Sequence, residues 1–218
     1  MFVVEGMSLL EQAVAAGWYV ESQFVPRGGE ALDNASPVFE CAPNVIERVA
    51  TTEAPKPLLA VVRMRPVDMP TSAHFVLVAD RLGDPGNAGT IIRSAEAAGA
   101  DVVVFTPGSV DVYNPKVVRS SAGSLFRIPV VEAELAAVAA TGLRLLATSS
   151  HHGEVYTEAV LHGRIAVVVG NEAHGVPDDA PVDGWLTIPH AGAAESLNVA
   201  MAATVLAFEV ARQRRLAR

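Results

Sequence analysis

The sequence predicts an α/β protein built around a parallel sheet. Short runs that are apolar throughout alternate with helical stretches over the last two thirds of the chain, and such strands are typical of a parallel sheet covered by helices on both faces. Of the 218 residues, 50% are hydrophobic, which is ample for a core and excludes a disordered chain. Ligands of such sheets bind at the carboxyl ends of the strands, so a site is expected in the loops there.

The first 65 residues carry a shorter α/β pattern of their own. Periodic apolar residues predict helices over Met7–Ala16 and Asn44–Ala50. The expected strands are the apolar runs Phe2–Glu5, Tyr19–Val25, Pro37–Cys41 and Leu58–Met64.

Residues 66–73 contain two prolines among polar residues and are expected to form a linker. They divide the chain into a domain of residues 1–65 and a domain of residues 74–218. The chain begins abruptly at an expected strand, so an N-terminal extension missing from this sequence stays an open alternative.

The second domain has the clearer alternation of strands and helices. Its expected strands are Phe75–Ala79, Val102–Phe105, Arg144–Thr148, Ile165–Val169 and Trp185–Ile188. Its expected helices are Ala88–Gly99, Pro115–Ala122, Glu132–Thr141 and Ala194–Arg215. The last helix is amphipathic, with an apolar face made by Leu197, Met201, Val205 and Phe208.

The composition excludes several classes of protein. No apolar run reaches 18 residues, and the N-terminus lacks the basic flank of a signal peptide, so we expect a cytoplasmic protein. The single cysteine, Cys41, excludes an internal disulfide framework and a cysteine-based zinc site. The net charge of −8 argues against non-specific coating of nucleic acid, but leaves room for a local basic site.

The loop after strand 75–79 is rich in glycine and enters a helix. Asn87 is a natural N-cap, and the N–H groups of a helix N-terminus attract anions. Arg93 lies beside the buried stripe of this helix and can reach toward the loop. A capped helix with a solvated arginine explains the loop equally well. Its glycine spacing matches neither the dinucleotide fingerprint nor the P-loop.

A second glycine-rich loop, residues 170–177, follows strand 165–169. Gly170 directly at the strand end would let a ligand approach the backbone closely. The carboxylate of Glu172 is expected at the carboxyl edge of the sheet, where it could pair with Arg93 or accept a proton. The plainer interpretation is a glycine-rich turn with an exposed acid.

A third loop, residues 188–198, enters the last helix. Ser196 could simply be its N-cap, and Asn198 would then cap or face solvent. Two further signals are weak: the pair His151 and His152 has no ligand spacing, so no metal site is expected. Arg119 lies on an expected helix, either on a solvated face or against a phosphate.

Taken together, the three loops resemble the motifs of the SpoU/TrmH (SPOUT) family of RNA 2′-O-ribose methyltransferases. The family's first motif is Asn-x-Gly with an arginine six residues after the asparagine, the second is Gly-x-Glu-x-x-Gly, and the third is Ile-Pro-Met followed by Ser-Leu-Asn-Val. The matching residues are Asn87, Gly89 and Arg93, then Gly170, Glu172 and Gly175, then Ile188, Pro189, Ser196, Leu197, Asn198 and Val199. His190 stands where the family commonly has methionine.

The resemblance implies both a fold and a cofactor. Residues 2–64 are similar, less specifically, to the ribosomal-protein L30e-like domain with which many members bind RNA. The rest would form a SPOUT-type parallel sheet whose last third is tied in a deep trefoil knot, although general topology rules disfavour knots. S-adenosylmethionine would bind within the knot, and a homodimer would place the active site at the subunit interface.

The resemblance also implies the roles of individual residues. The cofactor would be held by Thr148, Gly170, Asn171, Gly175, Ile188, His190 and Leu197. The catalytic residues would be Arg93, Asn87, Glu172, Ser196 and Asn198. Arg93 and Arg119 would contact RNA, within a local basic mouth to which Arg63 and Arg65 could also belong.

By resemblance, Arg93 is the base that removes the proton of the ribose 2′-hydroxyl. Arginine is a donor with a pKa above about 12 and has no acceptor when charged, and a nearby Glu172 would favour its charged form. We therefore prefer Arg93 as a clamp for phosphate and oxyanion, with the proton lost to phosphate or water. The expected pairing of Arg93 with Glu172 motivates this hypothesis.

Several alternatives stay open. The expected activity is methylation of a ribose in structured RNA, with 23S ribosomal RNA favoured over transfer RNA because of the first domain. A non-catalytic RNA-binding or ribosome-assembly module is the main alternative, and a generic nucleotide-binding protein is disfavoured by the missing phosphate motifs. The sequence names neither the target nucleotide nor a housekeeping or antibiotic-resistance role.

Overall fold

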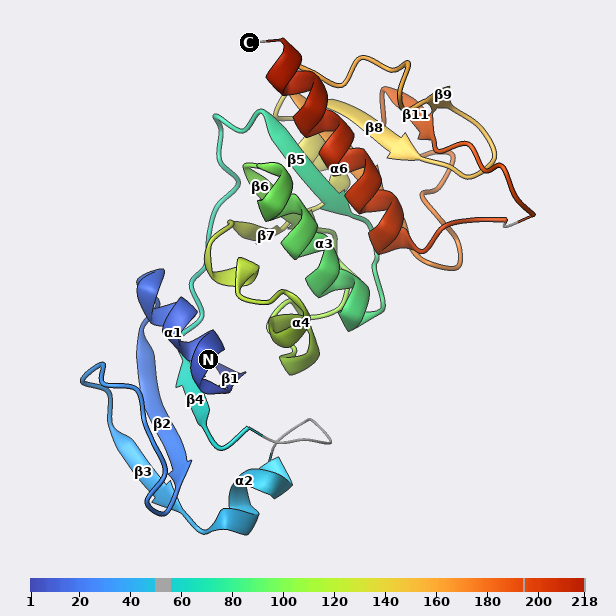
Figure 1. Ribbon diagram of the computed structural model, residues 1–218. Coiled ribbons are helices and arrows are strands. Elements are labelled where there is room, and N and C mark those ends of the chain that lie inside the picture. The colour runs from blue at the N-terminus through green and yellow to red at the C-terminus, as the bar shows by residue number, and fades with distance from the viewer. Residues whose placement is uncertain (50–55, 194, 218) are drawn as a thin grey trace.

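The computed structural model describes residues 1–49, 56–193 and 195–217. It contains a four-stranded sheet near the N-terminus and a seven-stranded sheet in the rest of the chain (Figure 1). The α/β class with a parallel sheet is confirmed. Two residues of the expected helices, Ala50 and Ala194, lie outside the described residues.

The N-terminal sheet has the strand order β1-β4-β2-β3. Strands β1 and β2 both pair antiparallel with β4, whereas β2 and β3 are parallel. The elements lie within a few residues of their expected positions: β1 (Phe2–Glu5), α1 (Met7–Ala15), β2 (Val20–Pro26), β3 (Val38–Cys41), α2 (Pro43–Val49) and β4 (Leu59–Val62).

The larger sheet has the order β7-β6-β5-β10-β8-β11-β9, and all of its pairings are parallel. Its central strands are apolar and fully buried, as expected for strands covered on both faces. The strands are β5 (Phe75–Ala79), β6 (Val102–Phe105), β7 (Val130–Glu132), β8 (Arg144–Thr148), β9 (Glu154–Val155), β10 (Ile165–Val169) and β11 (Gly184–Thr187).

Helices cover both faces of this sheet. Helices α3 (Pro85–Ala98) and α6 (Val199–Leu216) lie together on one face, where the hydroxyls of Ser94 and Thr204 are 2.7 Å apart (Figure 1). The short α5 (Leu135–Ala139) packs on the other face. The expected helix over 132–141 is shortened, because Glu132 belongs to β7 and α5 begins only after Glu134, its N-cap residue.

The face of α6 that packs in the chain differs from the apolar face seen in the sequence. The helix buries small and aliphatic residues, namely Ala200, Ala203, Leu206, Ala207 and Val210. The side chains of Met201, Val205 and Phe208 are between 37% and 58% exposed. Alanines permit close packing against α3, so the larger apolar residues are left on the outer side. No described helix is long and apolar enough to cross a membrane.

The N-terminal sheet packs against α4 (Pro115–Ser120) and the 3-10 turn after it, residues 124–126. The ring of Phe2 contacts the rings of Trp18, Tyr113 and Phe126, and the indole N–H of Trp18 donates to the carbonyl of Phe126 at 3.0 Å. The two sheets therefore share one apolar core.

Candidate active site

The carboxylate of Glu172 joins two of the three motif loops. Its Oε1 accepts hydrogen bonds from the backbone N–H of Asp84 at 3.1 Å and from the side-chain amide of Asn87 at 3.0 Å. Its Oε2 accepts from the backbone N–H of Gly83 at 3.2 Å. The loops after β5 and β10 are neighbours because their strands pair in parallel.

Asn87 extends this connection to the third loop. Its Oδ1 accepts from the side-chain amide of Asn198 at 3.0 Å. The Oδ1 of Asn198 caps α6 by accepting from the backbone N–H groups of Ala200 and Met201. One chain of hydrogen bonds therefore runs from Glu172 through Asn87 to Asn198 and fixes the three motifs relative to one another.

The N-caps differ from those expected. Asp84 caps α3, because its side chain accepts from the backbone N–H of Asn87 at 2.8 Å and Pro85 occupies the first turn. Asn87 is thus free to bridge Glu172 and Asn198. Asn198 rather than Ser196 caps α6, and Ser196 is exposed.

The electrostatics of the site favour Glu172 as a hydrogen-bond acceptor. Burial raises the pKa of Glu172, but hydrogen bonds from Asn87 and from backbone N–H groups outweigh it, so the pKa is lowered from its ordinary value. The carboxylate stays ionised at neutral pH. This geometry favours a hydrogen-bonding role for Glu172 over the other expectation, that it accepts a proton.

A cavity of about 660 Å³ opens beside this chain of hydrogen bonds. All seven residues expected to hold a cofactor line it: Thr148, Gly170, Asn171, Gly175, Ile188, His190 and Leu197. Three residues expected to be catalytic also line it, namely Glu172, Ser196 and Asn198. Its volume is within the range of small-molecule sites, which runs from about 300 to 1,000 Å³.

Two motif glycines are explained by close packing within the chain. A Cβ on Gly89 would lie 2.7 Å from the carbonyl of Val117, so α3 and α4 could not pack as they do. A Cβ on Gly170 would clash with the backbone of Gly175 and Val176. The close approach expected at Gly170 is therefore made by the loop itself as it folds back.

The comparisons with known proteins identify the family. The model of the SpoU rRNA Methylase family matches residues 74–208. The chain belongs to the SpoU rRNA methylase family. It is 36% identical over 220 residues to the 23S rRNA (guanosine(2553)-2'-O)-methyltransferase RlmP of Bacillus subtilis, covering 96% of this chain and 88% of that protein. It is 33% identical over 238 residues to the 23S rRNA (uridine(2479)-2'-O)-methyltransferase of Streptomyces viridochromogenes, covering 98% and 83%.

Solved structures agree with this assignment. The crystal structure of the SpoU methyltransferase AviRb from Streptomyces viridochromogenes in complex with AdoMet superposes with a TM-score of 0.88. The two chains are 32% identical, and the match covers 99% of this chain and 90% of AviRb.

In this SpoU-family chain, Arg93 lies apart from the other motif residues. It is exposed on α3 and belongs neither to the lining of the cavity nor to any ion pair among the described residues. The expected pairing with Glu172 is therefore wrong, because backbone and amide donors already surround that carboxylate.

Two other arginines of the expected basic mouth are paired with acids. Arg119 lies 3.5 Å from the buried Glu5 and thereby connects α4 to the N-terminal sheet. Arg63 forms an ion pair with Glu21 at 2.8 Å and covers the ring of Tyr19.

Sequence reasoning missed several aromatic residues of this SpoU-family cavity. His151, His152, His174 and Trp185 all line it, and the rings of His152 and Trp185 are 4.7 Å apart. The signal was present, because the histidine pair lies in the loop that follows β8. The described residues contain no group of side chains suited to a metal ion.

Proposed function

We propose that this chain transfers the methyl group of S-adenosylmethionine to a ribose 2′-oxygen in 23S ribosomal RNA. The observation that carries the proposal is the hydrogen-bonded chain from Glu172 through Asn87 to Asn198 at the edge of the cavity. The two relatives described above are named as 23S rRNA 2'-O-methyltransferases, which favours ribosomal over transfer RNA.

The residues present fit S-adenosylmethionine. The cavity includes residues that directly follow strands β10 and β11, namely Gly170 and Ile188, and it is lined by the acidic residues Glu172 and Asp178, whose carboxylates suit a cationic sulfonium. Residues near Thr148, Ile188 and Leu197 would hold the cofactor, which supplies an activated methyl group when bound.

The protein's own part in the reaction is mainly positioning. A ribose hydroxyl must lie in line with the methyl group, and holding it there lowers the entropic barrier. Asn87, Asn198 and Ser196 orient the ribose, and their fixed hydrogen bonds reduce reorganisation. Arg93 clamps the adjoining phosphate and the developing oxyanion through its planar fork, and the proton passes to phosphate or water.

The same proposal includes a homodimer and a knotted domain over residues 74–218. The exposed apolar face of α6 at Met201, Val205 and Phe208 supports a second copy as its partner. Residues 1–65 would bind RNA, joined by the linker at 66–73, in a cytoplasmic enzyme.

Met201→Glu should shift the protein toward monomer in sedimentation velocity, whereas the same change at exposed Leu216 should not. Equal behaviour of the two variants would refute this dimer interface.

The decisive experiment combines binding with mapping of the product. The protein is titrated with S-adenosylmethionine, then incubated with labelled cofactor and unmodified ribosomal or transfer RNA, and the product is mapped by mass spectrometry. We expect one ribose-methylated nucleotide in 23S RNA, and strongly reduced transfer by Asn87→Ala. No binding at millimolar cofactor, or methyl transfer to a base, would refute the proposal.

A further inference from the structure

The chain makes an unusual turn directly after β5. Asp80 still pairs with β10, because its backbone N–H donates to the carbonyl of Val169 at 2.8 Å. The next residue, Arg81, has a φ of +51°, in the left-handed region that residues other than glycine rarely adopt. Such a conformation persists only where its surroundings hold it.

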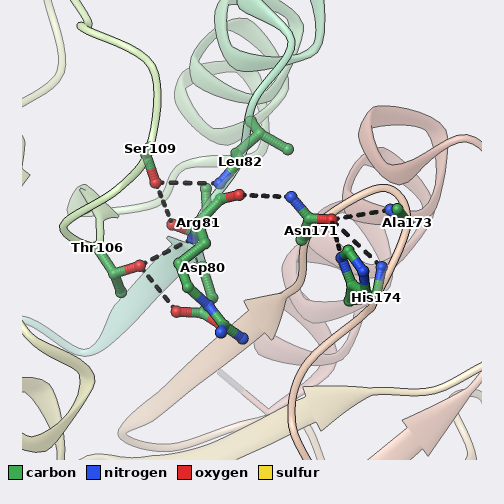
Figure 2. A network of polar contacts seen from close by, with 9 residues as sticks. Asp80, Arg81, Leu82, Thr106, Ser109, Asn171, Ala173 and His174 are labelled. Carbon is green, nitrogen blue, oxygen red and sulfur yellow. Dashed lines mark hydrogen bonds and ion pairs between the residues drawn. The ribbon is translucent and has the colours of Figure 1, made fainter.

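Asp80 and Thr106 hold this turn (Figure 2). The Asp80 side chain is buried and accepts from the hydroxyl of Thr106 at 2.8 Å and from the guanidinium of Arg81 at 3.0 and 3.1 Å. The hydroxyl of Thr106 in turn accepts from the backbone N–H of Arg81 at 2.9 Å. Thr106 therefore both donates to the carboxylate and fixes the peptide that must turn.

The turn directs the carbonyl of Arg81 at the second motif loop. The side-chain amide of Asn171 donates to this carbonyl at 2.8 Å. Its Oδ1 accepts from the backbone N–H groups of Ala173 at 2.9 Å and His174 at 3.2 Å (Figure 2). The amide nitrogen of Asn171 faces a carbonyl and its oxygen faces two N–H groups, so the orientation of the amide is fixed. These contacts also fix the fold of the loop.

The same turn and the same loop meet a second time at Glu172. This carboxylate follows Asn171 directly, and it accepts from the N–H groups of Gly83 and Asp84, which follow Arg81 by two and three residues. A change in the turn would therefore move both the donors and the loop that carries their acceptor.

We propose that Asp80 and Thr106 are positioning residues for the methyl-transfer site, acting through Arg81 and Asn171. Thr106 does not line the cavity described above and lies outside the three motifs. It acts by holding the loop over residues 170–176 in the conformation that binds cofactor and presents Glu172 to Asn87. The inference rests on the proposed function, because it assigns these residues to the same site.

A matched pair of variants tests the proposal. Thr106→Val keeps the shape of the side chain and removes the hydroxyl, whereas Thr106→Ser keeps the hydroxyl. We expect Thr106→Val to weaken S-adenosylmethionine binding about tenfold, because the loss of one hydrogen bond that holds the loop has an effect of this size. We also expect it to speed hydrogen exchange in residues 170–176. Thr106→Ser should match the wild type in both measurements, and the KM for RNA should stay unchanged in both variants.

A second variant tests whether the effect passes through the loop. Asn171→Asp replaces the amide donor with an oxygen that faces the Arg81 carbonyl. Asn171 is only partly buried, so the variant should still fold. If Thr106 acts through Asn171, adding Thr106→Val to Asn171→Asp should cause little further loss of cofactor affinity. Fully additive losses would overturn the proposed route.

The outcomes separate this inference from the proposed function. If the wild type binds cofactor and Thr106→Val equals Thr106→Ser in affinity and exchange, the inference alone is refuted. If the wild type binds no cofactor, the proposed function fails. The exchange of residues 170–176 still decides in that case whether the turn controls the loop.

Discussion

Replacement of Glu172 by glutamine tests whether the charge that joins the motif loops supports catalysis. The carboxylate accepts three hydrogen bonds, from Gly83, Asp84 and Asn87. Glutamine can still accept from Asp84 and Asn87 through its one oxygen. Its amide group then faces the N–H of Gly83, so that hydrogen bond is lost and two donors oppose each other.

The size of the effect follows from these contacts. A hydrogen bond to a charged group contributes about 1.5–3 kcal/mol, compared with about 0.5–1.5 kcal/mol for a neutral pair. Two weakened bonds and one lost bond would together cost about 3–4 kcal/mol in a dry site. Because Glu172 is exposed and partly screened by water, we expect about 2 kcal/mol, or about a 30-fold loss in kcat/KM.

Transfer of a labelled methyl group to unmodified 23S RNA measures this loss. Glu195→Gln is the matched control, since Glu195 lines the same cavity. The substitution removes the same charge but leaves the hydrogen bonds of Glu172 to Gly83, Asp84 and Asn87 in place. We expect Glu195→Gln to keep activity within a few-fold of the wild type. If the two variants lose activity equally, cavity charge and not the bridge is responsible; if Glu172→Gln is fully active, the bridge has no catalytic role.

Three other changes give separate tests. The pKa of Glu172 is lowered from its ordinary value of 4.5, so the stability that the ionised carboxylate adds is present above pH 4.5 and is lost as the pH falls further. Below that pH, the free energy of unfolding of the wild type should no longer exceed that of Glu172→Gln. Gly89→Ala should lower the free energy of unfolding by about 1–3 kcal/mol in denaturant titrations, because its Cβ would meet the backbone of α4, whereas Gly192→Ala, with open space around it, should change it by about 0.5 kcal/mol at most. Arg93→Lys keeps the charge and loses the fork, and should reduce kcat/KM about tenfold without changing cofactor affinity; near-full activity would contradict the clamp.

The sequence was sufficient to place the elements and to bring the three loops together. Central strands that are apolar throughout are recognisable from composition, and the carboxyl ends of parallel strands meet at one edge of a sheet. The strands β7 and β9 were missed because three and two residues are too few to show a period. The start of α3 was missed although Asp84 followed by Pro85 is itself a helix-start signal.

The partners within the site could not be predicted in the same way. A position on a strand end defines where a side chain begins, but not which of several donors reaches it. Arg93 was the expected partner of Glu172, because the sequence shows two opposite charges but not the distance between them. Backbone N–H groups of Gly83 and Asp84 are invisible to such an argument, yet they are closer and need no side-chain ordering.

The apolar face of α6 could not be assigned from the helix alone for a related reason. Periodicity shows that a helix has an apolar side, but not whether that side meets the same chain or another one. Here the alanines pack within the chain, and Met201, Val205 and Phe208 are left exposed. An apolar stripe beside a second face of small residues thus fits the proposed dimer, in which the small residues pack within the chain and the larger ones would meet the second copy.

The net charge of −8 has a different meaning once the ion pairs are known. Arg63 and Arg119, which were expected to widen a basic mouth, are neutralised by Glu21 and Glu5. Arg93 takes part in no ion pair among the described residues, and so keeps its charge for a phosphate. Six basic side chains are paired with acids among the described residues and the chain is acidic overall. Counterion release should therefore supply little affinity, and we expect recognition of RNA to depend on shape and on contacts from more than one surface. An acidic chain of this kind, with Arg93 outside the ion pairs of the described residues, is therefore expected to suit one structured target better than RNA in general.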